Sequence, residues 1–162
     1  MSISTRTKRE NMMSEIQVLK RDGNKDILDL EKLHKVVFYA CENINGVSAS
    51  EVEIKSSLQF YSGITSSEIQ ETLIKSAADL ISEEQPNYQW VAGRLICYHL
   101  RKMVYGQFEP WHILDLIKTN VEEGFYDSLL LEKYTEQEWD ELNSHLKHER
   151  DERMTYAAME QW

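Results

Sequence analysis

Apolar residues recur at helical spacing along four consecutive segments of this chain, and no other feature limits its fold as strongly. The first stripe lies within residues 30–45 and comprises Leu30, Leu33, Val37, Phe38, Cys41 and Ile44. Three more stripes follow between residues 48 and 105: Val52, Leu58 and Tyr61; Ile69, Leu73, Ala77, Leu80 and Ile81; Val91, Ala92, Leu95, Ile96, Leu100, Met103 and Val104. Since the chain contains only 6 Gly and 2 Pro, a turn-rich β-sandwich is disfavoured and a mainly α fold is expected.

Start and stop signals divide these stripes into separate helices. Ser48-Ala-Ser-Glu51 and Thr65-Ser-Ser-Glu68 each have the spacing of a capping box, in which two side chains satisfy N–H groups at the start of a helix. Pro86 suits the first turn of the fourth helix. Gly63 and Gly106 are expected to end the second and fourth helices.

A short hairpin is predicted before the helices. Residues 15–21 alternate apolar and polar side chains, Asp22-Gly23-Asn24 provides turn chemistry, and residues 25–28 form the return strand. Two strands alone are marginally stable, so the hairpin must lie on an apolar surface. The hairpin and four helices predict one unit over residues 14–105, a four-helix bundle capped by a small β-hairpin sheet. Residues 1–13 are polar and are expected to be a flexible leader.

The pattern changes after Gly106. A helix is predicted over residues 111–123 with Gly124 as its stop, followed by a short leucine-rich segment and a third capping box, Thr135-Glu-Gln-Glu138. We interpret residues 106–162 as the start of a helical domain that is truncated at Trp162.

Charge and composition exclude several classes of protein. The net charge is −10, and residues 121–152 alone hold 11 acidic and 3 basic residues, which disfavours binding to nucleic acid. No apolar run approaches the roughly 20 residues of a membrane span, and the N-terminus lacks the apolar region of a signal peptide. A cytoplasmic location without membrane contact is expected.

Several cations and hydroxyls stand where they could bind an anion. Lys20 and Arg21 lie at the hairpin tip, Lys32 lies in the first turn of a helix, Ser66 opens another helix, and Lys102 ends the fourth. Helix N-termini favour anions, so these groups could converge on a triphosphate. Alternatively, they are ordinary solvated side chains and caps, because the chain has neither a P-loop nor a GxGxxG motif.

Residues suited to catalysis are few. Cys41 and Cys97 lie on or beside apolar stripes and are expected to be buried structural thiols. His34 and His99 are interpreted as packed or boundary residues. The pair His145 and His148 has i, i+3 spacing but lacks the ExxH and HExxH patterns, so neither a metal site nor a catalytic residue is predicted.

A set of collinear motifs resembles a known family. The motifs are Val18-Leu-Lys-Arg-Asp-Gly23, Leu30-Glu-Lys-Leu-His34, Gln59-Phe-Tyr-Ser-Gly-Ile-Thr-Ser-Ser-Glu-Ile69, Ala77-Ala-Asp-Leu-Ile-Ser82, Pro86-Asn-Tyr-Gln89 and Leu100-Arg-Lys-Met-Val-Tyr-Gly-Gln-Phe-Glu-Pro110. Together they resemble the ATP-cone at the N-terminus of the large subunit of class I ribonucleoside-diphosphate reductase, of the bacterial and phage type. His148-Glu-Arg-Asp151 and Thr155-Tyr-Ala-Ala158 resemble the helical segment that follows the cone in that family.

The resemblance implies an allosteric site for ATP, which activates, or dATP, which inhibits, each bound with Mg²⁺. By similarity the lysines meet phosphates, and Asp26 or Asp29 meets the base or the ribose. Ser66 stands where threonine is common, and Gln70 where some relatives carry a histidine linked to inhibition. The complete set of implied nucleotide contacts is Val18, Lys20, Arg21, Asp26, Ile27, Leu28, Asp29, Leu30, Glu31, Lys32, Ser66 and Lys102.

The resemblance also implies partners. These are the remainder of the large subunit, which carries the catalytic barrel, and the radical-bearing small subunit, in an oligomeric enzyme that makes deoxyribonucleotides for DNA synthesis. No position of this chain matches the family's catalytic cysteines, so the chain alone is expected to be inactive and to hold no redox cofactor. The alternatives are a stand-alone nucleotide-sensing module and a helical interaction module without a ligand.

Overall fold

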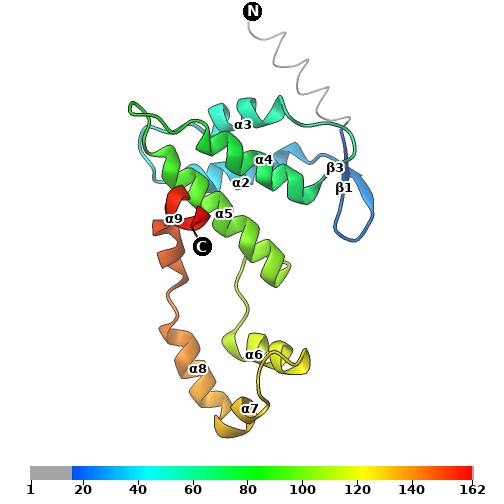
Figure 1. Ribbon diagram of the computed structural model, residues 1–162, viewed down its shortest axis with the longest axis vertical. Coiled ribbons are helices and arrows are strands. Elements are labelled where there is room, and N and C mark those ends of the chain that lie inside the picture. The colour runs from blue at the N-terminus through cyan, green and yellow to red at the C-terminus, as the bar shows by residue number, and fades with distance from the viewer. Residues whose placement is uncertain (1–15, 162) are drawn as a thin grey trace, which may run out of the picture. The chain divides into compact units, whose positions relative to one another are not determined.

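A computed structural model describes residues 16–161 of the chain (Figure 1). The predicted leader, residues 1–13, lies outside the described residues. The contacts divide the described residues into two compact units, one formed by residues 16–99 with 152–161 and the other by Leu100–Asp151. This division differs from the predicted domains at 14–105 and 106–162, because the last residues return to the first unit. Each unit is described by itself below.

The first unit opens with the predicted hairpin. Strands β1 (Gln17–Leu19) and β2 (Lys25–Ile27) pair antiparallel, with Gln17 opposite Ile27. Gly23 adopts a φ of +82°, which a residue with a side chain rarely tolerates, and Asn24 accepts a 2.8 Å hydrogen bond from the N–H of Lys20. The turn chemistry therefore fixes the hairpin as expected.

A third strand joins this hairpin, and it was not predicted. Strand β3 (Ile64–Thr65) pairs parallel with β1, so the sheet order is β2-β1-β3. Val18 lies opposite Ile64, and both side chains are buried. The strand holds two residues, too few to show the alternation by which strands are recognised in a sequence.

The four predicted helices are confirmed, and the chain is mainly α. They are α2 (Leu30–Cys41), α3 (Ala49–Ser57), α4 (Ser66–Ala78) and α5 (Tyr88–Tyr105). The predicted stop at Gly63 is wrong, because α3 ends at Ser57. Helix α5 begins two residues after Pro86, and Gly106 follows its end with a φ of +69°. A short helix, α9 (Tyr156–Glu160), belongs to the returning residues of the first unit.

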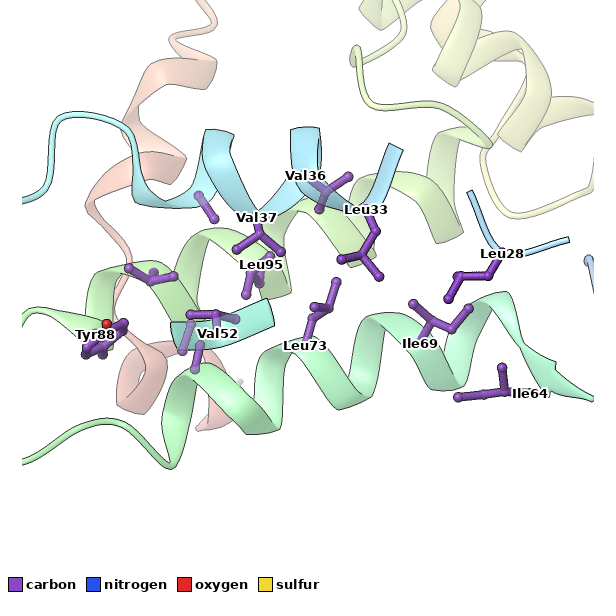
Figure 2. Packing of buried hydrophobic residues seen from close by; sticks show 14 of the residues in the cluster. Leu28, Leu33, Val36, Val37, Val52, Ile64, Ile69, Leu73, Tyr88 and Leu95 are labelled. Carbon is purple, nitrogen blue, oxygen red and sulfur yellow. The ribbon is translucent and has the colours of Figure 1, made fainter. Parts of the chain in front are cut away.

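One apolar core joins the helices of the first unit to the sheet (Figure 2). Side chains from β1, β3 and the helices α2 to α5 meet in it, and the residues labelled in the figure are Leu28, Leu33, Val36, Val37, Val52, Ile64, Ile69, Leu73, Tyr88 and Leu95. The predicted stripes are wrong at seven positions, whose side chains are exposed: Phe38, Leu58, Tyr61, Ile81, Leu100, Met103 and Val104. At the first of these sites Val36 is buried instead, because α2 is rotated relative to the predicted face.

One of the two capping boxes in this unit forms and the other does not. The hydroxyl of Thr65 accepts a 3.1 Å hydrogen bond from the N–H of Glu68, whose carboxylate accepts from the N–H of Thr65 at 2.7 Å. Ser48 makes no side-chain cap on α3, so that prediction is wrong. The Tyr88 hydroxyl instead accepts from the N–H of Ser48 at 2.9 Å and donates to the carboxylate of Glu51.

The second unit is built from shorter helices. They are α6 (Ile113–Glu122), α7 (Leu129–Lys133) and α8 (Glu136–His145), and the 3₁₀ helix η1 (His148–Arg153) follows them. Gly124 ends α6 with a φ of +79°, and the third capping box forms at Thr135 as predicted. Trp139 is buried in this unit. Within residues 16–161, no helix combines the length and apolarity needed to cross a bilayer.

Candidate functional site

A close ion pair lies across the hairpin, between the residue that follows β1 and a residue of β2. Lys20 Nζ lies 2.5 Å from Asp26 Oδ2, and about half of each side chain remains exposed, 48% and 57%. The hydrogen bond to Asp26 and its charge raise the pKa of Lys20, and the same bond lowers the pKa of Asp26. Both groups are therefore ionised at neutral pH and accessible to a ligand.

The N-terminus of α2 follows the hairpin closely in the sequence. Asp29 caps it, because its Oδ1 accepts a 2.9 Å hydrogen bond from the N–H of Lys32. Lys32 is exposed in the first turn, where the helix dipole favours an anion. The side chains of Val18 and Leu28 are buried in the core (Figure 2 labels Leu28), so a ligand would not contact them.

The N-terminus of α4 is brought to the same end of the sheet by the parallel strand. Leu19 of β1 pairs with Thr65 of β3, and the two strands run in the same direction. Lys20 and Ser66, the next residues of each strand, therefore leave the sheet at the same end. Ser66 is the first residue of α4 and is half-buried. The sheet thus places a hairpin lysine beside a helix start with hydroxyl groups, an arrangement that suits a phosphate.

Two buried polar atoms lie on the helices that follow, α4 and α5. Gln70 Oε1 on α4 and His99 Nδ1 on α5 are buried without a hydrogen-bond partner in the part of the chain that the structure describes. Burial lowers the pKa of His99, while the charge of Glu71 opposes and that of Arg21 adds to this shift. The sequence does not show that these two atoms are buried without a partner.

The remaining predicted contacts are distributed as follows. Ile27 is an exposed apolar residue of β2, Leu30 is partly buried against the core, and Glu31 pairs with Lys35 at 2.8 Å. Lys102 lies in the last turn of α5, is half-buried and belongs to the second unit. The assignment of all these residues to a nucleotide stays a prediction.

The structure also describes the residues that were weighed for catalysis. Cys41 is partly buried, and burial raises the pKa of its thiol to about 11, so it is a poor nucleophile at neutral pH. His99 is packed as expected, but His34 is exposed and its Nδ1 lies 2.6 Å from Glu53 Oε1. Among residues 16–161, no group of three or more His, Cys, Asp or Glu side chains could hold a metal ion.

Comparison with known proteins fits this geometry. The ATP cone domain family matches residues 16–103, which include the sheet, helices α2 to α4 and all but the last two residues of α5. The chain belongs to the ATP-cone family. The cone so defined contains the hairpin, both helix N-termini and Lys102.

The similarity continues beyond the cone. The chain is 47% identical over 150 residues to the Ribonucleoside-diphosphate reductase 1 subunit alpha of Escherichia coli, covering 93% of this chain and 20% of that protein. It is 41% identical over 148 residues to the Ribonucleoside-diphosphate reductase subunit alpha of Enterobacteria phage T4, covering 90% of this chain and 19% of that one. The chain thus resembles the N-terminal region of these subunits and spans about a fifth of their length.

Proposed function

We propose that this chain binds ATP or dATP, with Mg²⁺, at the end of the sheet where the hairpin meets the N-termini of α2 and α4. The observation that carries the proposal is the parallel pairing of Leu19 with Thr65, which sets Lys20 beside Ser66 within a matched ATP-cone. The donor set fits a triphosphate, because it combines cations, hydroxyls and helix N-terminal N–H groups.

The proposed contacts divide by chemistry. Lys20, Lys32 and Lys102 bind the phosphates, and Ser66 donates its hydroxyl to them. Asp26 or Asp29 accepts hydrogen bonds from the base or the ribose. The buried orphan atoms of Gln70 and His99 support the proposal, since a ligand with polar groups would satisfy them.

The proposed role is the regulation of ribonucleotide reduction, as part of a ribonucleoside-diphosphate reductase large subunit. A nucleotide can regulate only if it binds one assembly state better than another, so ATP and dATP must favour different states of the enzyme. The partners in this proposal are the rest of the large subunit and the radical-bearing small subunit. The chain by itself supplies no catalytic cysteine and does not turn over ribonucleotides.

Calorimetric titration of the whole chain with ATP and dATP, each with Mg²⁺, tests the proposal. Saturable heat and a raised melting temperature are expected with both nucleotides, and no release of phosphate. The absence of both heat and thermal shift would favour the helical interaction module without a ligand. A dCDP assay of the chain with a small subunit and reductant is expected to give no product.

A further inference from the structure

The residues that return to the first unit lie directly on α5. We call residues 152–161 the return segment. A Cβ added at Gly93 would lie 2.0 Å from the carbonyl oxygen of Met154, closer than packed atoms come. Tyr156 of the same segment packs against the apolar core, and Thr155 caps α9 through the N–H of Ala158 at 3.2 Å. The return segment therefore docks backbone to backbone, and only glycine at position 93 permits it.

Arg94, the neighbour of Gly93, joins this segment to α2. Its Nη1 donates to the carbonyl oxygen of Glu42, the C-cap of α2, at 2.6 Å, and its Nη2 lies 3.6 Å from Glu152 Oε2. The Arg94 side chain is only 13% exposed, and its buried Nε has no partner among the described residues. One guanidinium thus contacts both the C-cap of α2 and the return segment.

Helix α2 links this contact to the nucleotide site. Its N-terminal end carries Asp29 and Lys32, and its C-cap, Glu42, is held by Arg94. Val37 and Ala40 within the helix are fully buried. A regular helix packed in this way moves as a body, so a ligand that fixes one end also fixes the carbonyl at the other.

We propose that Arg94 couples the nucleotide site to the return segment, so that ATP at the N-terminus of α2 favours the docked segment. The inference rests on the proposed function. Because such coupling is reciprocal, a chain whose return segment cannot dock binds ATP more weakly by the same factor. The return segment follows the second unit directly in the sequence, so its docking carries the nucleotide signal to the point where the chain leaves that unit.

Hydrogen exchange of the whole chain, with and without Mg-ATP, tests this coupling. ATP is expected to slow exchange of the amides in residues 156–160 about fivefold. Gly93→Ala keeps α5 helical but blocks docking, so the same amides exchange faster and ATP affinity falls about fivefold. Arg94→Lys, which keeps the charge but loses the planar fork, is expected to abolish the effect of ATP on these amides.

Arg101→Lys is the matched control, because Arg101 lies on the same helix but pairs with Asp151 in the second unit at 2.8 Å. It should retain the response to ATP. If ATP binds to the parent chain and leaves exchange in the return segment unchanged, the coupling is overturned and the proposed function stands. If the parent chain binds no nucleotide, the proposed function and the coupling both fail. If Gly93→Ala does not fold, the same exchange measurement on Arg94→Lys and Glu152→Gln tests the coupling.

Discussion

The hydroxyl of Tyr88 donates a hydrogen bond to the carboxylate of Glu51, joining the start of α5 to the first turn of α3. The same hydroxyl accepts from the N–H of Ser48, which in a capping box would bond the Glu51 carboxylate instead. Burial is the main reason that the pKa of Tyr88 rises to about 12, and the bond to Glu51 adds to it. The phenol is therefore protonated, and available as a donor, at any pH at which the protein is studied.

Tyr88→Phe removes this bridge while keeping the ring in the core. The N–H of Ser48 loses its partner, so the free energy of unfolding should fall by about 1–3 kcal/mol. Urea unfolding monitored by circular dichroism measures the change. Tyr61→Phe is the control, because the Tyr61 hydroxyl bonds Glu68 on the exposed surface and its loss should alter stability by less than about 0.5 kcal/mol. Equal effects of the two substitutions would contradict this account of α3.

A second pair of variants tests the observed core against the predicted stripes. Leu73 is fully buried on α4 and Leu58, expected to be apolar and packed, is 67% exposed. Leu73→Ala should lower the free energy of unfolding by about 2–5 kcal/mol through lost contacts and a cavity. Leu58→Ala should change it by about 0.5 kcal/mol or less. Denaturant midpoints at constant m-value measure both changes. A large loss of stability in Leu58→Ala would show that Leu58 is packed in the core, as the sequence pattern predicted.

Local chemistry was enough to predict most of the secondary structure. The turn at Gly23, the caps at Thr65 and Thr135 and the stop at Gly106 depend on neighbours in the sequence, and each was found as predicted. The capping box at Ser48 does not form, because the Ser48 N–H and the Glu51 carboxylate both bond the hydroxyl of a distant residue, Tyr88. Strand β3 was missed for a related reason, since its pairing with β1 is non-local.

The candidate site divides in the same way. The cations and helix starts could be recognised from position alone, and the strand pairing then shows that Lys20 and Ser66 lie at the same end of the sheet. The orphan atoms of Gln70 and His99 could not be predicted, because burial without a partner is a property of packing. Gly93 likewise has no local signal, and its role depends on the distant residue Met154.

His99 should make stability depend on pH. Burial lowers its pKa from the ordinary value of 6.5, so the unfolded chain binds a proton there before the folded chain does. Stability is therefore complete above about pH 6.5 and falls as the pH drops below that value. Melting temperatures of the parent and of His99→Gln between pH 5 and 8 check this. The melting temperature of the variant should fall less on acidification than that of the parent. His145→Gln, an exposed histidine of α8, should follow the parent.

The two complete capping boxes allow a matched test of the N-terminus of α4. Thr65→Ala and Thr135→Ala each remove the hydroxyl that accepts from the N–H three residues on, and should each destabilise their helix by about 1 kcal/mol. Only Thr65 adjoins the proposed site, so only Thr65→Ala should also weaken ATP binding. Calorimetry beside thermal unfolding separates the two effects. A similar loss of affinity in both variants would mean that it reflects stability rather than the site.

The last prediction concerns how the proposed site recognises charge. Lys20 and Lys32 come from a hairpin and a helix start, and a triphosphate would contact both. Since a hydrogen bond between charged groups is among the stronger ones, Lys20→Ala, Lys32→Ala and Lys102→Ala should each weaken ATP binding by a factor within the range of about 10 to 100. ATP and dATP should lose affinity equally, because they differ at the ribose and not at the phosphates.

The control for these lysine variants is Lys118→Ala, on the exposed surface of α6, which should leave affinity unchanged. Melting curves should barely move, because the bridge between Lys20 and Asp26 is exposed and such pairs contribute little. Removing Lys20 also leaves the charge of Asp26 beside the site, which repels phosphate, so this variant should lose the most. If Lys20→Ala and Lys32→Ala bind both nucleotides like the parent while keeping its melting curve, the nucleotide does not lie at this end of the sheet.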